Sequence, residues 1–142
     1  MNKVKVDYTF EQLGQLIEQY NDLFLSKEVL ALEGSLGAGK TSFVAALLKR
    51  WGVTDPIASP TFNYVNVYRL PNNKTVYHFD LYRLSTMEMF LKSGFGDYLY
   101  QENSICIIEW PEIIKPLLLK SVCFIEIQFL QMDVRRLIVN LS

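Results

Sequence analysis

The fold is decided by the stretch LEGSLGAGKTSF, residues 32–43. Its spacing, Gly-x-x-x-x-Gly-Lys-Thr, is that of a loop that wraps a polyphosphate and joins a buried strand to a helix. Directly before it, EVLALE (28–33) is a short apolar run that predicts the strand. Directly after it, KTSFVAALLKRWG (40–52) has a helical pattern and ends on Gly52, a typical helix stop. A glycine-rich turn without a ligand is the less favoured interpretation.

Each position of this P-loop has a chemical reason. Gly34, Gly37 and Gly39 allow positive φ angles and let backbone N–H groups approach phosphate closely. Lys40 would place a cation between the β- and γ-phosphates, and Thr41 would offer a hydroxyl to Mg²⁺. The helix that follows would point its positive end at the same charges. We therefore expect the loop to bind a nucleoside triphosphate.

The second half of a P-loop site is a buried strand that ends in an acid, which completes the metal shell. SICIIEW (104–110) is such a strand, and its acid is Glu109. We expect Thr41 and Glu109 to hold Mg²⁺. The alternative is an ordinary acidic residue at a strand end.

A further acid lies in HFDLYRL (78–84), where Asp80 has apolar neighbours in a strand. A carboxylate in such surroundings is costly unless it is paired or functional. Asp80 could orient the attacking water, act as base or hold a metal-bound water, or it could form an ion pair with Arg83. His78 shares its face because strands have a period of two. A lone histidine is more typical of a structural residue.

ASPTF (58–62) follows the P-loop helix, where a switch segment that senses γ-phosphate and Mg²⁺ would lie. Ser59 and Thr61 bring hydroxyls to it, and Pro60 stiffens the turn. A plain Ser-Pro loop leading into a strand is the alternative.

The rest of the chain predicts helices and strands in a mixed order. KVKVDY (3–8) alternates as a strand, and Thr9 with Gln12 forms a capping box. Ser85 with Glu88 predicts a second capping box. Two pairs of strands are expected to form hairpins, 61–70 with 75–84 and 121–130 with 134–141. We therefore predict an α/β fold: a single P-loop NTPase-like domain (1–142) whose mixed sheet has a mostly parallel centre, antiparallel hairpins and flanking helices.

Composition narrows the class of protein. A chain of 142 residues suits one domain, and 50% hydrophobic residues suit a compact core. The net charge of −1 and the lack of a basic run argue against tight binding to nucleic acid through many phosphates. The N-terminus shows no signal peptide and no apolar run is long enough for a membrane span, so we expect a cytoplasmic protein. Cys106 and Cys123 are expected to be reduced core residues.

The nucleotide is expected to be ATP, because the Asn-Lys-x-Asp motif that reads guanine is absent: NKTV (73–76) has Val76 where the Asp belongs. No clear arginine finger is present either. Since such a finger accelerates hydrolysis about a thousand-fold or more, we expect the isolated protein to hydrolyse ATP slowly.

Four motifs in this order, GSLGAGKTSF, SPTFNYV, YHFDLYRL and IIEWPE, resemble the TsaE family. Members are small bacterial P-loop ATPases needed to make threonylcarbamoyladenosine in tRNA. The resemblance runs from about residue 28 to 115. It implies ATP and Mg²⁺ as cofactors and a TsaB–TsaD complex as the partner, whose turnover the protein would drive. Any contact with tRNA would be indirect, and no membrane is involved. The oligomeric state is not predicted, although the family suggests that it changes with nucleotide.

The resemblance also assigns roles to positions. Lys40, Asp80 and Glu109 would be catalytic, Thr41 and Glu109 would hold Mg²⁺, and Ser59 with Thr61 would form the switch segment. Trp110 would lie beside the nucleotide, although a Trp after a buried strand is most often a packing residue. Thr9, with Tyr8, would border the adenine. The loop from Gly34 to Ser42 would bind the nucleotide through Gly34, Leu36, Gly37, Ala38, Gly39, Lys40, Thr41 and Ser42.

This chain departs from the family pattern at two loop positions. Ser35 stands where the family usually has Asp, which removes a negative charge beside the loop. Ser42 stands where it usually has Thr and keeps the hydroxyl. Two other functions remain open: a small-molecule P-loop kinase, and a nucleotide-binding module that does not hydrolyse ATP.

Overall fold

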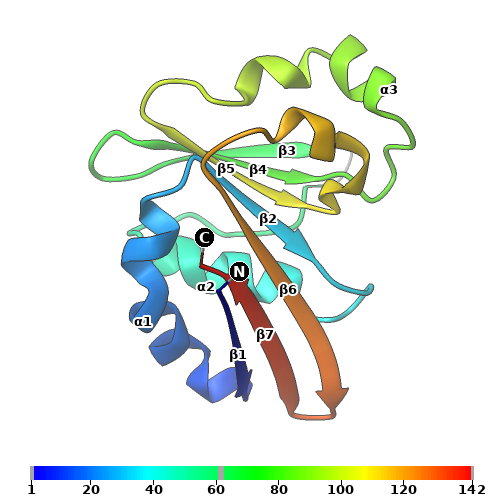
Figure 1. Ribbon diagram of the computed structural model, residues 1–142. Coiled ribbons are helices and arrows are strands. Elements are labelled where there is room, and N and C mark those ends of the chain that lie inside the picture. The colour runs from blue at the N-terminus through cyan, green and yellow to red at the C-terminus, as the bar shows by residue number, and fades with distance from the viewer. Residues whose placement is uncertain (1, 61–62, 142) are drawn as a thin grey trace.

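The computed structural model describes residues 2–60 and 63–141. Its centre is a seven-stranded sheet in the order β1-β7-β6-β2-β5-β4-β3 (Figure 1). The strands are β1 Lys3–Tyr8, β2 Val29–Glu33, β3 Val65–Arg69, β4 Thr75–Asp80, β5 Ser104–Glu109, β6 Val122–Gln131 and β7 Val134–Asn140. The helices are α1 Leu13–Leu25, α2 Lys40–Arg50 and α3 Met87–Lys92, with 3-10 turns at Phe10–Gln12, Phe95–Tyr98 and Pro111–Leu117.

The sheet is parallel in its centre and antiparallel at both sides. Strands β6, β2, β5 and β4 run parallel, whereas β1 and β7 add antiparallel pairs at one side and β3 adds one at the other. The predicted mixed α/β fold is therefore confirmed. The apolar runs of β2 and β5 have a physical reason, because strands covered on both faces carry hydrophobic residues at successive positions.

Two hydrophobic layers lie on opposite faces of the sheet. Helices α1 and α2 cover one face, where Phe24 and Phe43 pack edge to face with ring centroids 5.8 Å apart. Helix α3 and the later 3-10 turns pack against the other face, where Phe79 contacts Phe90. Successive side chains of a strand point to opposite faces of the sheet, and the two cysteines lie on different faces. Cys123 belongs to the first layer and Cys106 to the second. Both are buried and free, as predicted.

The start of one helix differs from the sequence prediction. The predicted box of Ser85 and Glu88 is wrong, because Thr86 is the N-cap of α3 and its Oγ1 accepts a hydrogen bond from the N–H of Met89 at 3.1 Å. Thr86 has the extended backbone that an N-cap requires, so its hydroxyl is placed to accept that bond. The box of Thr9 and Gln12 is present and opens the 3-10 turn that leads into α1.

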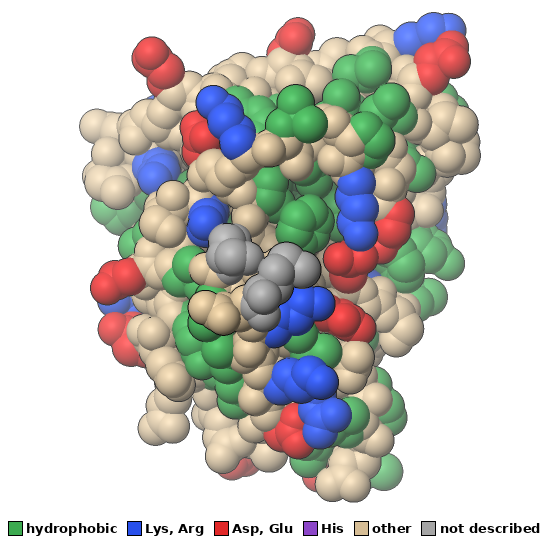
Figure 2. Space-filling model, in the orientation of Figure 1, with side chains coloured by type: hydrophobic (Ala, Val, Ile, Leu, Met, Phe, Trp, Pro, Cys, Tyr) green, Lys and Arg blue, Asp and Glu red, His purple; other side chains and the backbone are tan. Residues whose placement is uncertain are grey.

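The edge strand β1 is apolar on one side and charged on the other. Val6 and Tyr8 pack toward α1, while Lys3, Lys5 and Asp7 are exposed on the opposite face. Figure 2 shows Lys/Arg and Asp/Glu side chains lying side by side on the molecular surface. On β1, Asp7 forms an ion pair with Arg136. Within residues 2–60 and 63–141, none of the helices has the length and apolar character to cross a membrane.

Candidate nucleotide site

The candidate site lies where the carboxyl ends of three parallel strands meet. The register pairs Glu109, the last residue of β5, with Leu32 on β2 and with Asp80 on β4. The loop after β2 then leads directly into α2. Ligands of open α/β sheets bind at this edge, because the strand ends and helix N-termini converge there.

Glycine is required at two points of the loop. Gly34 has φ 152°, and a Cβ there would lie 2.5 Å from the carbonyl oxygen of Ile127. Gly39 has φ 111° and is the N-cap of α2. The loop therefore passes close to β6 and turns so that the first N–H groups of α2 face the space enclosed by the loop.

Three oxygen-bearing side chains come together beside the loop. The hydroxyl of Thr41 lies 2.9 Å from that of Ser59 and donates to Glu109 Oε1 at 3.1 Å. Hydroxyl and carboxylate oxygens are the ligands that Mg²⁺ prefers, and Mg²⁺ is commonly held by one or two protein groups together with phosphate oxygens. This donor set fits the predicted metal. Thr61, the other predicted switch residue, lies outside the described residues.

Lys40 is folded back onto the loop. Its Nζ donates to the carbonyl oxygens of Gly34 and Ser35 and lies 3.8 Å from the centre of the Trp110 ring. Burial lowers the pKa of Lys40, while the carboxylates of Glu109, Asp80 and Glu112 oppose that shift. The ammonium therefore has carbonyl and π partners that an incoming phosphate would have to replace.

Trp110 is held in an uncommon conformation directly after β5. Its φ is 58°, which bulky residues rarely adopt, and its ring lies 4.9 Å from that of Tyr82. The Trp110 ring stands beside the ammonium of Lys40 and lines the same cavity. The turn thus places an aromatic wall at the site.

Asp80 closes the site from the side of β4. Its Oδ1 accepts a hydrogen bond from the N–H of Tyr82 at 3.1 Å, and no described residue forms an ion pair with it, Arg83 included. Burial raises the pKa of Asp80; the Tyr82 N–H opposes this and the carboxylate of Glu109 adds to it. A cavity of about 270 Å³ brings Asp80 together with most of the predicted residues: it is lined by Leu36, Gly37, Gly39, Lys40, Thr41, Ser42, Ser59, Asp80, Glu109 and Trp110.

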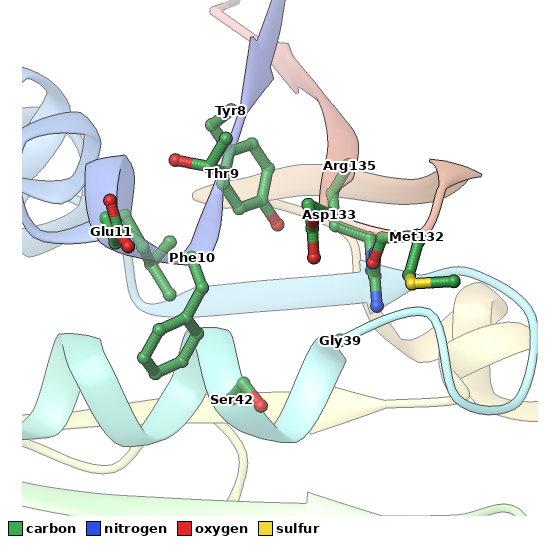
Figure 3. Close-up of a pocket in the computed structure, with 10 residues that line it drawn as sticks. Tyr8, Thr9, Phe10, Glu11, Gly39, Ser42, Met132, Asp133 and Arg135 are labelled. Carbon is green, nitrogen blue, oxygen red and sulfur yellow. The ribbon is translucent and has the colours of Figure 1, made fainter.

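A second cavity of about 420 Å³ lies on the other side of Gly39 and Ser42, which line both spaces. Figure 3 shows Tyr8 and Thr9 at its upper side, Phe10 beside α2, and Arg135 reaching in from β7. The structure therefore places Thr9 in a hollow next to the loop.

Sequence reasoning missed Arg135. Its Nε donates to the carbonyl of Ala38 at 2.9 Å, and its Nη1 donates to those of Gln131 and Met132 at 3.4 Å each. It therefore ties the β6–β7 hairpin to the P-loop. The signal was present in VRRLIVN, because the period of two puts Arg135 on the same face as the buried residues Leu137 and Val139.

His78 has a partner that sequence reasoning did not predict. The ring is fully buried, and its Nε2 lies 2.6 Å from Glu109 Oε2. Both side chains are on the face of the sheet that packs against α2. His78 is two positions before Asp80 on β4, so these two side chains share that face. The histidine thus contacts the acid that is predicted to hold Mg²⁺.

Comparison with known proteins gives one consistent result. The model of the family described as "Threonylcarbamoyl adenosine biosynthesis protein TsaE" matches residues 7–138. The chain is 37% identical over 109 residues to the tRNA threonylcarbamoyladenosine biosynthesis protein TsaE of Rickettsia typhi, covering 76% of this chain and 74% of that protein. It is 40% identical over 111 residues to the protein of the same name from Synechocystis sp., covering 72% and 64%.

The matched parts do not always span the whole relative. The matches cover 62% of the Rickettsia felis protein and 51% of that from Rickettsia conorii. The crystal structure of Bacillus subtilis YdiB is similar over 99% of this chain and 87% of its own, with a TM-score of 0.75 and 25% identity.

Proposed function

The chain belongs to the TsaE family of threonylcarbamoyl adenosine biosynthesis proteins, and from this premise we propose that it binds ATP with Mg²⁺ and hydrolyses it in support of the threonylcarbamoyladenosine modification of tRNA. One observation carries the proposal. The loop lysine, the hydroxyls of Thr41 and Ser59, and the two strand-end acids Asp80 and Glu109 line a single cavity. This is the set of groups that transfer of a phosphoryl group to water needs.

Thr41 and Glu109 are the residues that would hold Mg²⁺. Bound there, the ion would neutralise charge on the β- and γ-phosphates and act as a Lewis acid. Lys40 would exchange the carbonyls of Gly34 and Ser35 for phosphate oxygens. This exchange suits a cation whose present partners are neutral.

Asp80 would orient the attacking water and accept its proton. A carboxyl whose pKa is raised by burial is a better proton acceptor than an ordinary aspartate, because its conjugate acid is weaker. The Tyr82 N–H fixes one oxygen of this carboxylate, which leaves the other free to face the water.

The nucleoside would occupy the second cavity. Lys40 and Thr41 line the cavity that holds the two acids. Gly39 and Ser42 line that cavity and also the second one, which is bordered by Tyr8 and Thr9. Phosphates running along the loop would therefore end in a nucleoside at Tyr8 and Thr9. The volume of about 420 Å³ lies within the usual range for small-molecule sites.

Hydrolysis by the protein alone is expected to be slow. No arginine among the described residues lines the cavity that holds Lys40 and Asp80. The guanidinium of Arg135 donates to backbone carbonyls instead. We propose that a TsaB–TsaD complex supplies the missing stimulation, and that contact with tRNA is made through that complex, since the chain itself has a net charge of −1.

The test is Mg²⁺-dependent ATP hydrolysis by the pure protein, with and without the matching TsaB–TsaD pair. Slow turnover that rises at least ten-fold with the pair is the expected result. Asp80→Asn is the control: it should bind ATP as the parent does and lose hydrolysis with or without the pair. Phosphate that moves to a metabolite instead of water would identify a kinase, and ATP binding with no turnover under either condition would identify a binding module.

A further inference from the structure

The chain contains a single histidine, and the mechanism above does not use it. His78 lies on β4 with none of its surface exposed. It contacts Glu109, the acid at the end of β5, whose side chain is 2% exposed. A buried carboxylate needs hydrogen-bond donors on both of its oxygens to offset the loss of water.

The two oxygens of Glu109 have different nearest partners, and the Thr41 hydroxyl lies 3.4 Å from Oε2 as well. Oε1 accepts from the hydroxyl of Thr41 at 3.1 Å, and Oε2 lies 2.6 Å from His78 Nε2. An ionised carboxylate only accepts hydrogen bonds, so with Glu109 ionised the proton of this short contact lies on Nε2. The other ring nitrogen, Nδ1, is buried and has no partner among the described residues. A proton on Nδ1 would be a buried donor without an acceptor, which favours the tautomer with its proton on Nε2.

We propose that His78 is a positioning residue: by donating its Nε2–H to Glu109 it fixes the carboxylate beside Thr41, in the orientation that receives the divalent cation. The inference rests on the proposed function, because it concerns the same metal site. Removing a group that hydrogen-bonds to a metal ligand and orients it typically lowers metal affinity 10- to 100-fold.

The first experiment reads the tautomer in the unaltered protein. After removal of any tag, ¹⁵N labelling of the one histidine gives the protonation of each ring nitrogen by long-range ¹⁵N–¹H correlation. A proton on Nε2 that is protected from exchange is expected. A proton on Nδ1 alone would leave Nε2 without a donor for Glu109 and would overturn the proposal.

The second experiment compares two substitutions of equal length. His78→Gln keeps an amide N–H that can reach Glu109, whereas His78→Met keeps a similar length without a donor. Mn²⁺ binding to each protein with ADP is measured by electron paramagnetic resonance, and ADP binding is measured separately in EDTA. His78→Met should lose 10- to 100-fold in Mn²⁺ affinity with metal-free ADP affinity nearly unchanged, and His78→Gln should regain most of the loss.

The outcomes separate the two levels of the proposal. If the unaltered protein binds neither ADP nor Mn²⁺ with ADP, the proposed function fails and the role of His78 falls with it. If the unaltered protein binds both and His78→Met binds Mn²⁺ equally well, only the role of His78 is refuted. Equal losses in the Gln and Met variants would show that the donor is not the operative feature, and would also refute it.

Discussion

A methyl group on Gly34 would lie 2.5 Å from the carbonyl oxygen of Ile127, a distance that requires the backbone to move. Gly34→Ala should therefore destabilise the protein by about 2–4 kcal/mol, from steric overlap added to an unfavourable φ. Gly37→Ala is the matched comparison, because φ there is 78° but nothing lies within 4 Å of the added carbon. It should cost only about 1–2 kcal/mol. Urea unfolding followed by circular dichroism measures both, and equal losses would contradict the steric account.

Asp80→Asn is expected to stabilise the fold while removing hydrolysis. Because burial raises the pKa of Asp80 in the folded state, ionisation disfavours folding once the pH exceeds the ordinary carboxyl range. At about pH 3 both states are protonated and the substitution should have no effect. At pH 7 the variant should gain up to about 1 kcal/mol, a small value because the side chain is partly exposed and screened.

The comparison is a set of thermal melts of both proteins between about pH 3 and pH 8. Asparagine keeps the oxygen that accepts from the Tyr82 N–H, so the charge is the main change. A gain in stability that is constant across this range would show that the charge of Asp80 is not the cause.

Residue identities at the loop could be predicted from sequence, but pairings between distant side chains could not. The P-loop spacing is local, so Lys40 and Thr41 needed no knowledge of the fold. The contact of His78 with Glu109 joins positions 31 residues apart and depends on β4 and β5 being neighbours. A lone histidine gives no signal of such a partner, so this contact could not be predicted from the sequence.

At the scale of elements, the β6–β7 hairpin is tied to the P-loop through Arg135. Replacing Arg135 with Met removes the donor to three backbone carbonyls and should weaken ADP binding about 10-fold, because the loop loses a contact that fixes Ala38. Amide hydrogen exchange of residues 38–40 should also become faster. A fluorescent ADP analogue and exchange mass spectrometry provide the two measurements.

Arg136→Met is the matched control for this prediction. Arg136 is the next residue on β7, points to the opposite face and forms an exposed ion pair with Asp7. Exposed pairs contribute little, so ADP binding and loop exchange should stay as in the parent. If the two variants weaken ADP binding equally, a general loss of positive charge, not the tie to Ala38, is responsible.

Most elements were predictable because their patterns are local. Alternation in β1, apolar runs in β2 and β5, and the turn between β3 and β4 each indicate the correct structure. The start of α3 was misplaced by one residue. Ser85 and Thr86 both carry the hydroxyl that an N-cap uses, and the choice between them depends on backbone angles that sequence spacing does not reveal.

At the scale of the whole molecule, the two cysteines report on the two layers. Burial raises the pKa of Cys106 to about 12 and that of Cys123 to about 11. Since the thiolate is the reactive form, both should react with a thiol reagent at least about 100-fold more slowly in the native protein than in urea. If the layers unfold together, both thiols should be labelled at the same rate, as mass spectrometry of timed samples can show. Faster labelling of Cys106 would mean that the layer of α3 opens separately.

The order of strands was harder to predict than the strands themselves. Sequence indicated a parallel centre and antiparallel hairpins, and both are present. It did not indicate that β1 would pair with β7. That contact joins residues more than 120 positions apart, and no short turn connects the two strands. Long-range pairing is specified by which apolar faces fit together, and that becomes visible only in three dimensions.

The charged outer face of β1 has a consequence for how copies of this protein behave in a crowded solution. A strand at the border of a sheet offers unpaired backbone groups to any other strand that meets it. Lys3 and Lys5 on β1 repel an identical strand from a second copy, and Asp7 is already engaged by Arg136. The same alternation that directs Val6 and Tyr8 into the core therefore discourages sheet-to-sheet growth into aggregates.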